Sequence, residues 1–195
     1  IFSSGMAAIS ASLFSNLESG DHVVFQNDLY GGTRNFIKKQ FPKYGIEFSF
    51  SLGLEVSDFE RELKPNTVGI YIETPSNPLF KIIDLSKVSH LAKDNKCWTI
   101  ADNTFASPVN QNPISFGIDM VVHSATKYLG GHSDISAGAV VSNNFFIDKI
   151  YDHAKNFGGN LSEFSTWLLE RSIKTVFLRV EAQNKNAMDL AKFLE

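Results

Sequence analysis

The feature that most constrains the fold is a regular alternation of short apolar runs and amphipathic segments along the whole chain. A short apolar run bounded by turn residues is typical of a buried strand in a parallel sheet. Alternating strands and helices predict a mostly parallel α/β sheet with helices on both faces. The predicted strands are residues 22–25, 46–50, 68–72, 98–101, 120–122 and 137–141. The predicted helices are residues 6–13, 36–44, 56–63 and 84–93, followed by three helical segments that close the chain. One of these three, residues 166–179, carries apolar residues that are predicted to be mostly buried.

The composition argues against several classes of function. The net charge is −3 and no basic run is present, so nucleic acid is not an expected partner. No apolar stretch approaches the roughly 18 residues of a membrane span, so no membrane is expected either. The single cysteine, Cys97, excludes an internal disulfide and fits a cytoplasmic location. No cysteine or histidine spacing typical of a metal site occurs, so no metal is expected.

The extent of the sequence suggests part of a longer protein. It begins at Ile1 without an initiator methionine and ends at Glu195 within a helical pattern. Its 195 residues suit one large domain. We therefore treat residues 1–195 as one domain of a larger chain.

The most unusual stretch is residues 117–134, GIDMVVHSATKYLGGHSD. Lys127 follows the end of a predicted strand, at the edge where ligands bind in open α/β sheets. A lysine partly removed from water can attack a carbonyl carbon and form a Schiff base. Ser124 and Thr126 are two residues apart, so in an extended chain their hydroxyls face one way and suit a phosphate. Lys127 starts on the opposite side, so the chain must bend if all three serve one ligand. From these residues alone, a solvated surface lysine is the favoured interpretation, and a reactive lysine is the alternative.

Polar or aromatic groups also follow three other predicted strands. Tyr30 precedes two glycines that allow close approach of a flat ligand, although an aromatic lid over the core is the alternative. Asn77 lies in an extended turn before a proline, and a plain turn role is the alternative. Asp102 ends a core strand, where an acid is costly unless it has a partner, and a helix cap is the alternative.

The start of the first helix adds a possible anion site. Residues 3–6 read Ser-Ser-Gly-Met, and a small-residue turn before a helix exposes unpaired backbone N–H groups. A plain helix cap is again the alternative. If a parallel sheet gathers all these groups at one edge, they supply an amine, an acid, phosphate donors and a face for a ring. Pyridoxal phosphate requires this set of groups.

Several motifs make the chain resemble a known family. The segments SSGMAA, DLYGGT, ETPSNP, ADNTF, HSATKYLGGHSD and LLERSIKT are similar to those of the cysteine and methionine metabolism family of pyridoxal-phosphate enzymes. The resemblance covers nearly the whole chain, and HSATKYLGGHSD is its most specific part. It implies the large domain of the aspartate-aminotransferase-like fold, which is fold type I, over residues 1–195. It also implies a homotetramer of dimers with shared active sites, and a small-molecule amino acid as substrate.

The resemblance also implies a role for each matching residue. Lys127 corresponds to the lysine that binds the cofactor aldehyde, and Asp102 to the acid on the pyridine nitrogen. Tyr30 corresponds to the tyrosine stacked on the ring, and it or Lys127 would handle protons. Asn77 would bond the ring hydroxyl oxygen. The phosphate would be bound by the backbone amides of Gly5 and Met6 and by the hydroxyls of Ser124 and Thr126.

The reaction is less constrained than the cofactor. The resemblance implies trans-sulfuration, with cystathionine γ-synthase or γ-lyase activity expected first. Alternatives are cystathionine β-lyase, methionine γ-lyase, O-acetylhomoserine sulfhydrylase, another pyridoxal-phosphate reaction such as transamination, and an inactive binding protein. Methionine γ-lyases of the family typically carry cysteine where Gly32 stands, so glycine favours the longer cystathionine. The family's N-terminal arm, and its small C-terminal domain with the arginine for the substrate carboxylate, are expected outside residues 1–195.

Overall fold

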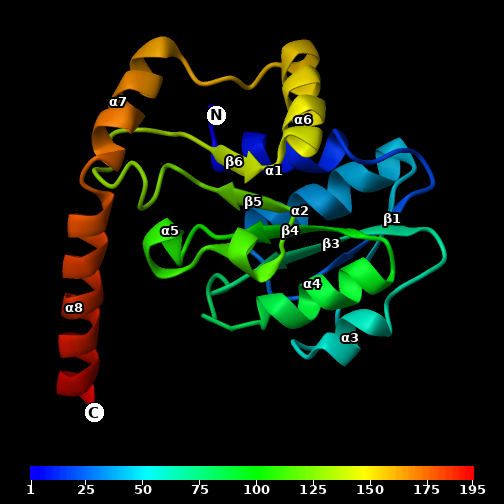
Figure 1. Ribbon diagram of the computed structural model, residues 1–195, viewed down its shortest axis with the longest axis horizontal. Coiled ribbons are helices and arrows are strands. Elements are labelled where there is room, and N and C mark those ends of the chain that lie inside the picture. The colour runs from blue at the N-terminus through cyan, green and yellow to red at the C-terminus, as the bar shows by residue number, and fades with distance from the viewer.

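A six-stranded mixed sheet forms the centre of the computed structural model, which describes residues 1–195 (Figure 1). The strand order is β2-β1-β3-β4-β5-β6. The first five strands in this order pair in parallel, and β6 is antiparallel to β5. The predicted mostly parallel sheet is therefore confirmed. The strands are β1 (His22–Phe25), β2 (Glu47–Phe50), β3 (Thr67–Glu73), β4 (Trp98–Asp102), β5 (Met120–His123) and β6 (Ala139–Ser142).

Helices cover both faces of the sheet, as predicted. One core cluster joins the sheet to α1 (Gly5–Phe14), α2 (Gly31–Gln40) and α6 (Asn144–Phe157). A second core cluster joins the opposite face to α3 (Val56–Glu60) and α4 (Leu85–Asp94). Figure 1 shows these two layers above and below the sheet. Three shorter helices complete this part of the chain: η1 (Phe41–Tyr44), α5 (Ser107–Asn110) and η2 (Pro113–Phe116).

Three predicted elements differ in their bounds by more than one residue. Helix α3 ends at Glu60, three residues before its predicted end. Helix α2 begins at Gly31, five residues before the predicted start, because the double glycine forms its first turn instead of a loop. Strand β6 begins at Ala139, two residues later than predicted. The backbone N–H and C=O of Ala137 bond instead to Thr126, so this residue belongs to the turn beyond β5.

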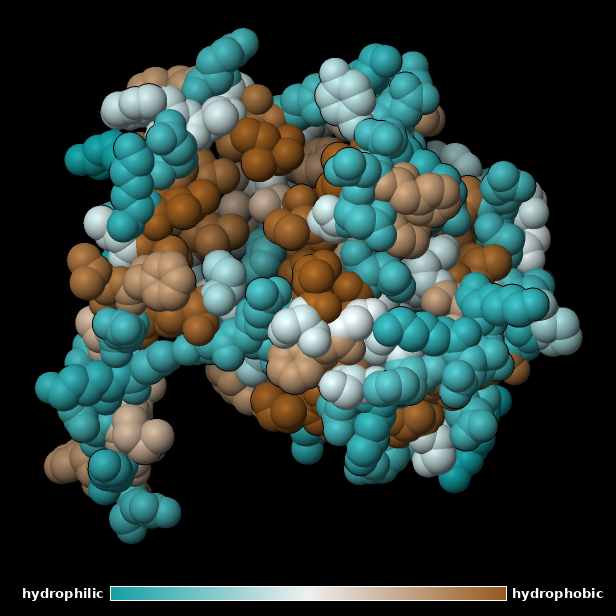
Figure 2. All heavy atoms as spheres, in the orientation of Figure 1, coloured by the Kyte–Doolittle hydropathy of each residue, from teal (hydrophilic) through white to brown (hydrophobic).

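The prediction of a mostly buried segment 166–179 is wrong. The segment is divided between α7 (Glu163–Ile173) and α8 (Val176–Leu194), which run along one side of the molecule (Figure 1). Leu169 and Val176 are buried in a third small cluster, but Trp167 is 55% exposed. A helical spacing of apolar residues predicts one face to be covered, and here that face is largely exposed. Figure 2 shows hydrophobic residues around α7 and a largely hydrophilic lower part of α8.

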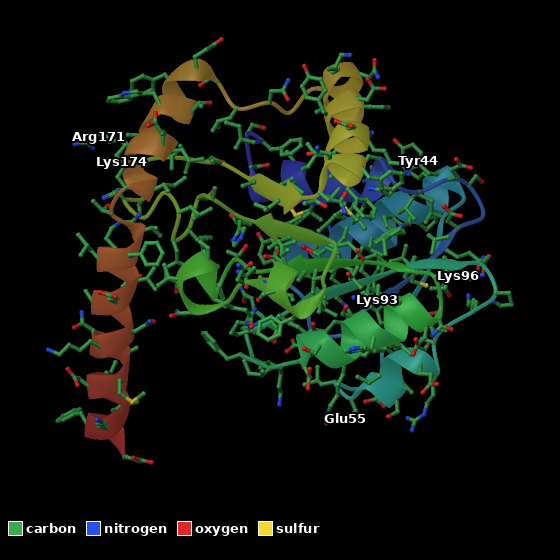
Figure 3. The ribbon with its side chains drawn as sticks, in the orientation of Figure 1. Tyr44, Glu55, Lys93, Lys96, Arg171 and Lys174 are labelled. Carbon is green, nitrogen blue, oxygen red and sulfur yellow. The ribbon has the colours of Figure 1, made fainter.

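The remaining surface carries charged residues, some of which form ion pairs. Glu55 and Lys93 lie on the side of α3 and α4, while Arg171 projects from α7 away from the sheet (Figure 3). No helix of the structure is both long and apolar enough to cross a membrane.

Candidate active site

The carboxyl ends of β1, β3, β4 and β5 meet the start of α1 around one cavity of about 270 Å³. This volume is near the lower end of the roughly 300–1,000 Å³ usual for small-molecule sites. All eight residues singled out from the sequence line the cavity. They are Gly5, Met6, Tyr30, Asn77, Asp102, Ser124, Thr126 and Lys127.

The turn after β5 brings Lys127 and the two hydroxyl residues to the same cavity. The N–H of Lys127 donates to the carbonyl of Ser124 at 3.0 Å. The chain therefore bends at the place where a bend is needed for all three residues to serve one ligand. The hydroxyl of Thr126 donates to the carbonyl of Ala137 at 3.1 Å, so the Thr126 proton is already engaged. Lys127 is exposed, which differs from the partly desolvated position expected from the sequence. The reason is that Lys127 lies on a turn beyond the strand end and not in the strand itself.

Asp102 is 5% exposed and has no cationic partner among the ion pairs of the structure. Its Oδ1 accepts bonds from the N–H of Thr104, at 3.0 Å, and from the Thr104 hydroxyl. The Tyr71 hydroxyl donates to Oδ2 at 3.5 Å. Burial raises the pKa of the Asp102 carboxyl, and the bonds from Thr104 and Tyr71 oppose this rise. A buried acid without a cation is suited to a positively charged ligand.

Helix α1 directs free backbone donors into the cavity. Ser4 caps this helix by accepting a bond from the N–H of Ala7 at 3.1 Å, while the N–H groups of Gly5 and Met6 have no acceptor within the protein. A Cβ atom added at Gly5 would lie 2.7 Å from Cβ of Ser124, so glycine is needed for this close approach. Free N–H groups at a helix start, next to a hydroxyl, form an anion site.

Tyr30 forms the wall of the cavity before α2. Its side chain is unobstructed on one side, since the residue is 47% exposed. Gly32 lies against the other side: a Cβ added there would overlap the Tyr30 ring and lie 3.0 Å from its Cζ. A Cβ at the neighbouring Gly31 would meet no atom within 4 Å. The position of the Tyr30 ring therefore depends on Gly32 and not on Gly31.

The structure adds residues that the sequence reasoning did not assign. Thr104 joins two parts of the site, because its hydroxyl also accepts the N–H of Ser124 at 2.8 Å. Glu73 lines the cavity beside Asp102, its register partner on the neighbouring strand. Both belong to motifs already noted, ADNTF and ETPSNP, which were the only signals available for finding them.

Arg179 supports the Lys127 turn from α8. Its guanidinium donates to the carbonyls of Tyr128 at 2.8 Å, Leu129 at 3.3 Å and Ser172 at 2.9 Å. Its Nε also bonds to the Thr175 hydroxyl at 3.1 Å. This role could not be predicted from sequence, because Arg179 is 52 residues from Lys127 and lies in a segment with the pattern of an ordinary amphipathic helix.

The residues around the cavity fit pyridoxal phosphate. The unpaired N–H groups of α1 and the Ser124 hydroxyl suit the phosphate, and the buried Asp102 suits a protonated ring nitrogen. Lys127 offers an amine, and Tyr30 offers an aromatic face. This α/β fold and this set of groups define the class of pyridoxal-phosphate-dependent enzymes. The model of the family described as Cys/Met metabolism PLP-dependent enzyme matches residues 1–195, and the chain belongs to that family.

Different relatives of this chain are named for different activities. The chain is 47% identical over its full length to the cystathionine gamma-lyase of Bacillus subtilis and 45% identical to a cystathionine beta-lyase of Lactococcus lactis. In each case it covers 51% of the relative, so the chain spans about half the length of these proteins. The crystal structure of cystathionine gamma-lyase from Lactobacillus plantarum complexed with L-serine matches 99% of this chain and 51% of that one. Its TM-score is 0.96 and its sequence identity 40%.

Proposed function

We propose that the full-length protein is a trans-sulfuration enzyme that synthesises or cleaves cystathionine at the γ carbon. The observation that carries this proposal is the convergence of Lys127, Asp102, Tyr30 and the anion site on one cavity. We also propose that residues 1–195 are the large cofactor-binding domain, and that the complete protein assembles as a homotetramer with active sites shared between subunits.

Each residue of the site has a role in this proposal. When bound, pyridoxal phosphate supplies an aldehyde and an electron-withdrawing ring. Lys127 binds that aldehyde and, once its amine is free, takes and returns protons at the substrate carbons. Asp102 stays ionised and keeps the ring nitrogen protonated. The protonated ring then stabilises the negative charge that develops in the transition state. Tyr30 covers one face of the ring and shares the proton transfers.

The remaining residues fix the position of the cofactor. The N–H groups of Gly5 and Met6 and the hydroxyl of Ser124 hold the phosphate, and Thr126 joins them by releasing the carbonyl of Ala137. Asn77 bonds the ring hydroxyl oxygen. Anchoring at both ends of a planar group leaves its reacting atom at a defined place beside Lys127.

The experiment that tests the reaction is product analysis with the full-length protein. It is incubated separately with cystathionine, with an O-acyl-homoserine plus cysteine as the incoming thiol, and with methionine, and the specificity constants are compared. Conversion of cystathionine or the homoserine ester better than methionine supports the proposal. A keto acid that keeps the thioether or ester group of its substrate indicates transamination, and no turnover of any amino acid indicates a binding protein.

Cystathionine β-lyase activity is the second candidate. It is favoured by the name of the Lactococcus lactis relative, which is nearly as similar to this chain as the γ-lyase. The products separate the two reactions: cleavage at the γ carbon releases cysteine, and cleavage at the β carbon releases homocysteine.

Residues 1–195 alone are expected to bind pyridoxal phosphate but to show no turnover. The residues lining the cavity include Lys127 as their one cation and no arginine, so nothing there pairs with a substrate carboxylate. Cofactor absorbance after gel filtration measures binding, and a thiol-release assay beside the full-length protein measures turnover. Measurable cystathionine cleavage by residues 1–195 would contradict the proposed sharing of the site.

Replacing Gly32 by alanine is expected to lower kcat/KM for cystathionine about tenfold or more, because the new Cβ displaces the Tyr30 ring. A change in one pocket contact is worth about 1–3 kcal/mol, which corresponds to roughly 10–200-fold. Gly31→Ala is the matched control, since its Cβ enters open space in the same helical turn. Equal kcat/KM values for the two variants would show that Gly32 does not determine the Tyr30 position.

A further inference from the structure

Glu73 is a buried carboxylate in the cavity wall that the proposed function does not use. It ends β3 and is 5% exposed. None of the ion pairs of the structure includes it. A buried carboxylate without a cation destabilises a fold unless hydrogen bonds compensate for its lost hydration. The bonds that it makes therefore indicate what it does.

The two oxygens of Glu73 bond to two different loops. Oε2 accepts the backbone N–H of Tyr30 at 2.9 Å, and Oε1 accepts the backbone N–H of Asn77 at 2.7 Å. Tyr30 follows β1 and Asn77 follows β3, so one carboxylate connects the loops of two neighbouring strands. Both bonds end on residues that line the cavity.

The buried side chain of Gln26 closes the same loop from the other end. Its Oε1 accepts the N–H of Glu73 at 2.8 Å, and its Nε2 donates to the carbonyl of Asp28 at 2.8 Å. The loop from Gln26 to Tyr30 is therefore bonded to Glu73 at both of its ends. Neither contact uses the Tyr30 side chain, which lines the cavity.

The chemistry of the contact requires a carboxylate. Only an ionised carboxyl offers an acceptor oxygen to each of two N–H donors, whereas an amide offers one oxygen and points its NH₂ group at the second donor. Aspartate keeps both oxygens but is one methylene shorter, so it cannot reach both N–H groups. Burial and the neighbouring Asp102 raise the pKa of Glu73 to about 7, whereas the bonds from the N–H groups of Tyr30 and Asn77 favour the ionised form and oppose this rise.

We propose that Glu73 is a positioning residue that holds the Tyr30 and Asn77 loops at the spacing needed to enclose the cofactor ring between them. This inference rests on the proposed function, in which Tyr30 covers the ring and Asn77 bonds its hydroxyl oxygen. In this role Glu73 acts through the backbone N–H groups of Tyr30 and Asn77.

The test uses Glu73→Gln and Glu73→Asp in the full-length protein, with the exposed Glu60→Gln as the control for loss of a carboxylate. Three quantities are measured: the Tm of the cofactor-free protein, its Kd for pyridoxal phosphate, and the visible circular dichroism of the bound cofactor. We expect both Glu73 variants to keep a Tm near that of the wild type. Their Kd is expected to rise about tenfold, with an altered dichroic band, while Glu60→Gln changes none of the three quantities.

A double-mutant cycle separates positioning from a general loss of structure. In a background of Tyr30→Ala and Asn77→Ala, adding Glu73→Gln is expected to change Kd less than twofold, because the two side chains that Glu73 positions are absent. An unchanged Kd and dichroic band in folded Glu73 variants overturns the proposal. Failure of both variants to fold also overturns it, since Glu73 would then be required for folding. If the wild type does not bind pyridoxal phosphate, the proposed function itself fails.

Discussion

Replacement of Lys127 by alanine in the full-length protein is expected to abolish turnover and the covalent attachment of the cofactor. Lys127 is the one amine among the residues that line the cavity, so no neighbouring group can replace it. The measurement is borohydride reduction followed by mass spectrometry of the peptide that contains residue 127. The same treatment links the cofactor to that peptide in the wild type.

Folding of the Lys127→Ala variant is expected to be unaffected, because the Lys127 side chain is exposed and makes no hydrogen bond or ion pair. Lys93→Ala, on α4 and away from the cavity, is the control for loss of an exposed lysine (Figure 3). A cofactor that remains reducibly attached in Lys127→Ala would show that another amine binds it.

Replacement of Asp102 by asparagine is expected to reduce kcat at least about 100-fold with little effect on folding. A charge-assisted bond is worth about 1.5–3 kcal/mol, and the loss in the transition state is expected to be larger because charge moves onto the ring there. A neutral amide cannot keep the ring nitrogen protonated. Steady-state kinetics with saturating cofactor measure this effect.

The stability of the cofactor-free protein gives an independent check on Asp102. Because burial raises the pKa of Asp102 in the folded state, the folded protein binds a proton more tightly than the unfolded chain. The contribution of Asp102 to the free energy of unfolding is therefore present at low pH. It is lost as pH rises from about 4, the pKa of an aspartate in the unfolded chain, through the higher pKa of Asp102 in the folded protein. We expect Asp102→Asn to equal or exceed the wild type in Tm at pH 8. Near-normal kcat in the variant, or a large drop in its Tm at pH 8, would contradict the assigned role.

The strands and the residues at their carboxyl ends could be predicted because both depend on local patterns. A buried parallel strand is an apolar run, and a parallel sheet places the residues that follow such runs at one edge. The groups following β1, β3, β4 and β5 were therefore expected to converge, and all of them line one cavity. The roles assigned to these residues remain predictions.

The roles of Glu73 and Arg179 could not be predicted, because their partners are backbone groups brought together only by the fold. Nothing in the order of residues shows that Glu73 meets the N–H groups of Tyr30 and Asn77, or that Arg179 meets the carbonyls of Tyr128 and Leu129. Burial of α7 was predicted wrongly for a related reason. Spacing identifies an apolar stripe, but the position of the helix in the fold decides whether anything covers it.

The contacts of Arg179 have a mechanical consequence. The Arg179 guanidinium joins the turn that carries Lys127 to the end of α7 and to α8. This turn and the long helix α8 therefore move together unless these hydrogen bonds break. A rotation of α8 about its first turn would pull on the carbonyls of Tyr128 and Leu129, one and two residues from Lys127. Val176 and Val180 of α8 also pack in one cluster with Ala125 and Leu129, so a displacement of this 19-residue helix reaches the turn that carries Lys127 through these contacts as well as through Arg179.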